Sequence, residues 1–206
     1  MMLQGQGDAN VQKFISDVDI VPVRLYLPAG DSYAKTAIRR WFRNNLRHRV
    51  GYKSAAAVSI PDSVNSNLIV LASRSSLPIF AAFQSQNHLR LTLTESGIGV
   101  DNKIFLDRVT VGKGTTLSHV ILTNWRLDTG KVHTYIASNH TRAIQAVADM
   151  LVNENEMLTE SFEVLLVGGR IPDKFQIGFE VSLHLHETNA TVERVWSSID
   201  GEPLVY

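Results

Sequence analysis

Residues 114–134 read GTTLSHVILTNWRLDTGKVHT, and this stretch decides the fold. A small-residue turn leads into the extended run 118–127, which stops at Asp128-Thr129-Gly130. A three-residue loop with glycine in the left-handed conformation joins antiparallel strands. The run 131–138, KVHTYIAS, is therefore expected to return beside the first strand. The stretch predicts a β-hairpin, with Ser118 at the head of one strand and His133 on its partner.

Two segments around this hairpin have helical periodicity. Residues 32–49 carry apolar side chains at helical spacing, with Asp31 or Ser32 as a cap. Residues 141–153 also carry apolar side chains at helical spacing, with Asn139 or Thr141 as a cap. Most of the remaining chain consists of short apolar runs separated by turn residues at intervals of about 8–12 residues, and we expect these runs to be strands. They include residues 54–61, 77–84 and 162–169. We expect an α+β fold, in which curved mixed or antiparallel β-sheets with a sandwich-like arrangement are flanked by two main helices.

The composition is that of a chain that folds around a core without covalent or metal crosslinks. The chain has 206 residues, 44% hydrophobic and 19% charged, a formal net charge of zero and no cysteine. We expect residues 1–13 to be a flexible tail and 14–206 to form a single domain. Zero cysteine excludes disulfides and thiolate metal sites. The absence of a long apolar run and of a secretory signal predicts no membrane span. The expected location is the cytoplasm, or a host cell reached without a classical signal peptide.

The first helical segment is strongly basic. Arg39, Arg40, Arg43 and Arg47 are candidate substrate-binding or partner-binding residues, because clustered cations attract an acidic partner. Nucleic acid is disfavoured, since the basic residues are not interleaved with aromatic side chains for base stacking. His184 and His186 point to one face of a strand, but no third ligand lies at a recognisable spacing. We expect no metal and no cofactor, and the oligomeric state is not indicated.

Ser118, His133 and His140 are the candidate catalytic residues, because a nucleophile needs a base within hydrogen-bonding reach. Residues 114–206 resemble the CheD and cytotoxic-necrotizing-factor group of glutamine deamidases. In that group a small-residue turn precedes a catalytic cysteine at the start of a strand, and the hairpin return carries a histidine. The resemblance places TTLSHVIL on the nucleophile strand, with Ser118 at the cysteine position, and GKVHT on the histidine strand. The helix HTRAIQAVADML and the strand EVLLVGGR are similar to the elements that follow in that group.

Hairpin register leaves two candidates for the base. If Asp128-Thr129-Gly130 is the loop, Ser118 faces His140, while His133 faces Trp125 on the opposite side of the sheet. A one-residue bulge would reverse the faces and bring His133 to Ser118. The resemblance favours His133, and the plain register favours His140.

Two functions follow from these patterns. The resemblance implies a glutamine or asparagine deamidase of the cysteine-hydrolase type that acts on a protein, with serine in place of the nucleophilic cysteine. A secreted effector or toxin is one form that such an enzyme takes. The alternative is a non-catalytic protein-interaction module of a virus, a phage or a secretion system. That module would use the basic helix, residues 33–49, to bind an acidic partner.

Overall fold

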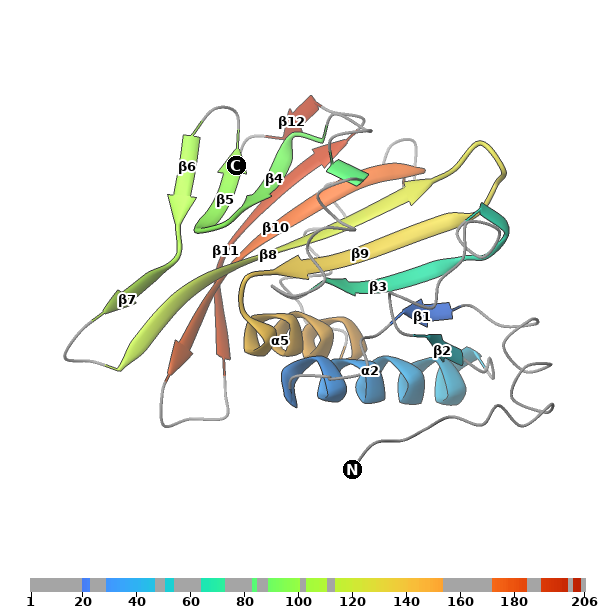
Figure 1. The fold of residues 1–206 in the computed structure, drawn as a ribbon, viewed down its shortest axis with the longest axis horizontal. Helices are drawn as coiled ribbons and strands as arrows, with labels where there is room; N and C mark the ends of the chain where they lie inside the picture. Colours follow the sequence, from blue (N-terminus) through green and yellow to red (C-terminus); the bar gives the residue numbers. More distant parts are fainter. Residues whose placement is uncertain are drawn as a thin grey trace.

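The structure is a computed structural model, and it confirms the α+β class. It describes residues 20–22, 29–46, 51–53, 64–72, 83–84, 89–100, 103–110, 114–153, 172–184, 190–199 and 202–204. The two main helices lie against one face of a large mixed sheet, and a small antiparallel sheet lies against the other face (Figure 1). The expected tail, residues 1–13, lies outside the described residues. The same is true of the expected strands 54–61 and 162–169.

The large sheet has the strand order β12-β11-β10-β8-β9-β3-β1-β2, and β7 also pairs with β8. Its strands are β1 (Ile20–Pro22), β2 (Gly51–Lys53), β3 (Leu68–Ala72), β7 (Arg108–Thr110), β8 (Thr115–Arg126), β9 (Val132–Ser138), β10 (Lys174–His184), β11 (Ala190–Ile199) and β12 (Glu202–Leu204). The pairs from β12 to β9 are antiparallel, whereas β9, β3, β1 and β2 run parallel to their neighbours. The small sheet contains β4 (Leu91–Thr94), β5 (Gly97–Val100) and β6 (Lys103–Leu106).

The β8–β9 hairpin has the predicted turn and register. Gly130 has φ 79°, a left-handed conformation that glycine adopts without steric cost. The Leu127 amide donates to the Lys131 carbonyl at 2.7 Å and closes the loop. Trp125 pairs with His133, as the register arithmetic predicts.

The helices form where periodicity predicts them, with differences at their ends. α2 (Ala29–Trp41) continues into a π-helix, η1 (Phe42–Leu46), where a single α-helix was expected over 32–49. α5 (Thr141–Val152) ends one residue before the expected end at residue 153. The expected cap of α5 is wrong: His140 occupies the N-cap position and makes no side-chain capping hydrogen bond.

Alternation along β8 explains the layered arrangement. Val120 and Leu122 point to the helices, where they join a core with Ile144 of α5. Ile121 points to the other face and joins a core with Ile98 of the small sheet. One strand therefore contributes to both cores, because successive side chains of a strand point to opposite faces. Residues 83–84, expected at the end of a strand over 77–84, are helical instead.

Candidate functional site

Ser118 and His133 lie on opposite faces of the large sheet, so the structure does not bring the two residues of the expected Ser118–His133 pair together. Ser118 shares the helix-facing side of β8 with Val120 and is 1% exposed. His133 is 5% exposed and pairs with Trp125, which packs on the small-sheet side. β8 and β9 contain no bulge between their paired residues that would bring the two side chains to one face.

Ser118 and His140 would face one another if the β8–β9 pairing continued, but they do not form a strand pair. Pairing of β8 with β9 ends at Val120 and Ser138, because the chain leaves the sheet there to begin α5. The His140 backbone amide donates to the Ser138 hydroxyl at 3.1 Å. Burial, followed by the charge of Arg142, lowers the pKa of His140 from its ordinary value of 6.5. The charge of Asp107 opposes this shift.

The strand β8 changes its partner at the level of Ser118 and His119. From Val120 onward its edge pairs with β9, and up to Leu117 the same edge pairs with β7. The residues that enter β7 and leave β9 therefore meet beside His119. On the other side of β8, Glu180 of β10 pairs with His119, and the register of β10 against β11 shifts between Glu180 and Val181. Such irregularities in a sheet are common beside functional sites.

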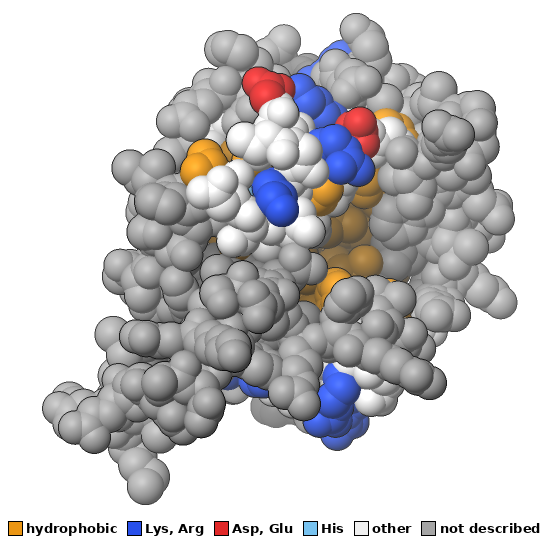
Figure 2. Space-filling view, turned by 90° about the vertical axis from the view of Figure 1, so that its right-hand side faces the viewer, with side chains coloured by type: hydrophobic (Ala, Val, Ile, Leu, Met, Phe, Trp, Pro, Cys, Tyr) orange, Lys and Arg blue, Asp and Glu red, His pale blue; other side chains and the backbone are white. Residues whose placement is uncertain are grey.

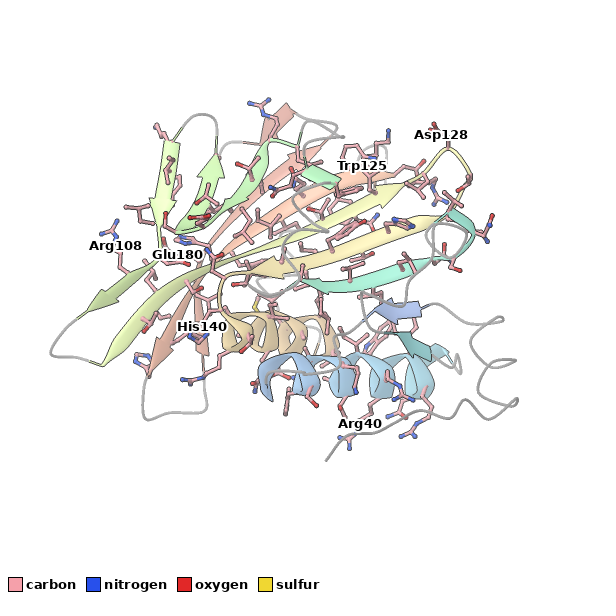
Figure 3. All side chains as sticks on the ribbon, viewed as in Figure 1. Arg40, Arg108, Trp125, Asp128, His140 and Glu180 are labelled. Carbon is pink, nitrogen blue, oxygen red and sulfur yellow. The ribbon has the colours of Figure 1, made fainter. Side chains whose placement is uncertain are left out.

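Five side chains gather at this point, and we call them the polar cluster: Asp107, His119, Asn139, His140 and Glu180. His119 is 1% exposed, with Nδ1 2.8 Å from Oδ1 of Asp107 and Nε2 3.5 Å from Oε2 of Glu180. Asn139 donates from Nδ2 to Oδ2 of Asp107 at 3.2 Å and to the carbonyl of Thr94 at 3.0 Å. In Figure 3, Glu180 and His140 lie toward the end of the sheet where β7 is placed, away from Trp125 and Asp128.

As far as the structure describes it, the polar cluster consists of two carboxylates, an amide and two imidazoles, and it contains no hydroxyl nucleophile. Ser118, the adjacent hydroxyl, points to the other face of the sheet. Among the described residues, Ser118 Oγ, Asn139 Oδ1 and His140 Nδ1 are buried without a hydrogen-bond partner. Buried polar atoms of this kind are rare in proteins, and two of these three atoms, Asn139 Oδ1 and His140 Nδ1, belong to the polar cluster.

The sequence patterns did not identify Asp107, His119, Asn139 or Glu180 as members of a site. One feature of the sequence nevertheless indicated that Glu180 has a specific partner. Glu180 interrupts the apolar run FQIGFEVSL between Phe179 and Val181, both of which are fully buried. A carboxylate at such a position is expected to have a specific partner, and that partner is His119.

The basic residues of α2 and η1 lie on the surface. Arg39, Arg40 and Arg43 are exposed, and Arg40 projects away from the molecule in Figure 3. Arg40 and Arg43 form no ion pair with any residue that the structure describes. Burial, followed by the charge of Arg39, lowers the pKa of Lys35. Arg47 lies outside the described residues.

An apolar cavity of about 200 Å³ lies between the ends of the helices and the large sheet. Its floor includes Ile69, Thr134, Asn124 and Phe175, which are consecutive cross-strand neighbours in β3, β9, β8 and β10. Its walls include Trp41 and Phe42 of α2 and η1 and Leu151 and Val152 of α5. Figure 2 looks onto this side of the molecule and shows a hollow lined by hydrophobic side chains.

The different lengths of strands and helices account for the cavity. β8 has 12 residues and spans about 40 Å at the rise of a strand. α5 also has 12 residues but spans only about 18 Å at the rise of an α-helix. The helix therefore leaves part of the strand beyond its C-terminus uncovered, and the cavity lies there.

No described helix is both long enough and apolar enough to cross a membrane. Within the described ranges, no group of three or more His, Cys, Asp or Glu side chains has the geometry of a metal site. No protein-family model matches the chain, and neither a curated protein nor a solved structure is significantly similar to it. The described residues thus offer three candidate functional sites, which are the polar cluster, the basic face of α2 and the apolar cavity.

Proposed function

We propose that the protein is a binding module that docks an acidic partner protein on the exposed face of α2 and η1. The observation that supports this proposal is the row of exposed arginines Arg39, Arg40 and Arg43 on a helix whose opposite face packs on α5. α2 and η1 contain a single acidic residue, Asp31, against the four cations Lys35, Arg39, Arg40 and Arg43, so the helix keeps a positive charge of its own. The chain as a whole has no net charge, and the attraction is therefore local to this face.

The aromatic side chains of this segment favour a protein partner over nucleic acid. Trp41 and Phe42 line the apolar cavity and are not on the arginine face. Tyr33 is half exposed, but its hydroxyl is hydrogen-bonded to Asp149. Binding of single-stranded nucleic acid usually combines cations with aromatic side chains on which bases stack. The arginine face offers charge and planar hydrogen-bond donors, which suit carboxylates.

Charge reversal on α2 tests this function against a matched control. The double substitution Arg40→Glu with Arg43→Glu should weaken binding of a fluorescein-labelled poly-glutamate peptide by roughly tenfold or more at low salt. The control is Lys103→Glu with Arg108→Glu, which makes the same change in net charge at exposed positions in β6 and β7. This control should change the affinity by less than about twofold.

Fluorescence anisotropy measured at low and moderate salt separates the outcomes. Equal losses in the two double variants would show that the attraction is not local to α2 and would contradict the proposal. Tighter binding of a labelled DNA oligonucleotide than of poly-glutamate, with loss in the α2 variant, would identify nucleic acid as the partner instead.

A second candidate function is the protein amidohydrolase that the sequence resemblance implies. It is favoured by the buried, unpartnered atoms Ser118 Oγ and His140 Nδ1 and by the hairpin register, whose continuation beyond Val120 and Ser138 would place the two residues opposite one another. A Ser118→Cys variant would supply a thiol at this position. Mass spectrometry of glutamine-containing substrate proteins after incubation with this variant should show a gain of about one dalton on glutamine if a thioester pathway operates. Unchanged masses would argue against this function.

A further inference from the structure

Asn124 lines the apolar cavity, and a neighbouring side chain sets the orientation of its amide group. The Thr134 hydroxyl donates to Oδ1 of Asn124 at 2.9 Å. This bond directs the amide group of Asn124, and its Nδ2 has no partner among the described residues. Among the described residues that line the cavity, Asn124 and Thr134 are polar and the others are aliphatic or aromatic.

We propose that this cavity binds a small molecule with a hydrocarbon or aromatic body and one oxygen atom that accepts a hydrogen bond from Asn124. The lining meets the general description of a ligand site, which is mostly apolar with a few placed polar groups. An apolar cavity of roughly 150 Å³ can hold benzene. The volume of about 200 Å³ therefore suits an aromatic ring or a short aliphatic chain.

The acceptor oxygen follows from the chemistry of Asn124. Its Oδ1 already accepts from Thr134, so the amide presents N–H groups to the cavity. A ligand with a carbonyl or carboxylate oxygen satisfies this donor, whereas an ammonium group would leave both partners as donors. A buried donor without a partner is costly, and the site should discriminate between these head groups.

The π-helix at the end of α2 is a second observation at the same place. η1 begins at Phe42, and Phe42 forms part of the cavity wall. π-helical turns are rare in proteins and are found frequently at functional sites. The rings of Phe42 and Trp41 pack in a T-shaped arrangement with their centroids 5.3 Å apart, so the cavity wall contains two aromatic side chains.

Three eight-carbon probes test the head-group preference on the unmodified protein. Isothermal titration calorimetry should show saturable binding of 2-octanone and octanoate, and binding of octylammonium should be roughly tenfold weaker or absent. Octanone and octanoate distinguish a neutral acceptor from an anionic one. Similar affinities for all three probes, or no saturable binding of either acceptor, would overturn the proposal.

Substitution of Asn124 tests the donor itself. Asn124→Asp keeps an acceptor for the Thr134 hydroxyl but removes the donor, and it should weaken 2-octanone binding by roughly tenfold or more. Asn67→Asp makes the same charge change at an exposed position and keeps the oxygen that accepts from the Val132 amide. This control should bind 2-octanone like the unmodified protein. Unchanged affinity in a folded Asn124→Asp protein would refute the role of Asn124, and the probe comparison remains decisive if that variant does not fold.

Discussion

Contacts of His119 join three separate parts of the chain. Its ring approaches Asp107 after β6 and Glu180 in β10, and its carbonyl accepts a hydrogen bond of 2.6 Å from the Ser138 hydroxyl at the end of β9. Asn139 extends the same group of contacts to Thr94 of the small sheet. A buried group of polar side chains is stabilising only when its members are paired. The polar cluster therefore orients β7, β9 and the small sheet around one imidazole.

The lowered pKa of His140 predicts a pH dependence of stability. As the pH falls below about 6.5, the unfolded chain takes up a proton that the folded protein resists. The stabilisation from neutral His140 is thus present above about pH 6.5 and is lost as the pH falls through the lower pKa of the folded state. We expect His140→Gln to make the free energy of unfolding fall less steeply than in the unmodified protein between about pH 7.5 and pH 5.

Urea titrations across this range measure the effect. Arg142→Gln serves as an internal control, because it removes the second cause of the shift and leaves burial in place. Its pH dependence should lie between those of the unmodified protein and His140→Gln. An equally steep dependence in all three proteins would show that other groups control acid stability.

Among the elements, β4 is held to the large sheet by side-chain amides. Gln176 of β10 accepts from the Leu91 amide and donates to the Leu91 carbonyl, both at 3.0 Å. Gln84 makes the same pair of contacts with Leu93, at 2.7 and 3.4 Å. Two glutamine side chains thus form hydrogen bonds with backbone groups of β4 that would otherwise be unpaired at the edge of a sheet. This arrangement connects the small sheet to β10.

We predict that Gln176→Leu destabilises the protein by about 2–4 kcal/mol, because it leaves two buried backbone groups of Leu91 unpaired. Gln84→Leu should cost roughly 1 kcal/mol or less, since Gln84 is only half buried and water can replace its hydrogen bonds. Urea unfolding gives the free energies, and hydrogen exchange should show the largest loss of protection at the Leu91 amide in the Gln176 variant. Equal costs for the two variants would contradict this account of the β4 edge.

For the molecule as a whole, the two cores should unfold together because β8 contributes to both. Ile144→Ala removes a fully buried side chain from the helix-side core and should cost about 2–5 kcal/mol. The substitution should lower hydrogen-exchange protection in β5 of the small sheet by the same free energy as in β9. Ile104→Ala, at a position that is 64% exposed, should cost less than about 0.5 kcal/mol. Retention of full protection in β5 of the Ile144 variant would show that the small sheet unfolds independently.

Local patterns predicted much of this fold. The Asp128-Thr129-Gly130 turn determined the register of the hairpin, including the pairing of Trp125 with His133. The periodicity of 141–153 identified the buried face of α5 from Ala143 to Ala148. These features depend on turn chemistry and on side-chain spacing over a few residues, which are properties of the chain itself. The same register arithmetic argued against a Ser118–His133 pair, which only the sequence resemblance favoured.

Tertiary structure alone decided which distant residues meet. Asp107 and Glu180 approach His119, and Gln176 reaches Leu91 across 85 positions of sequence, because β8 pairs with β10 on one edge and with both β7 and β9 on the other. The cavity around Asn124 likewise arises from a mismatch between the length of β8 and the length of the helix that covers it. Strand partners far apart in the chain are selected by the packing of the entire core, and no short sequence pattern contains that information.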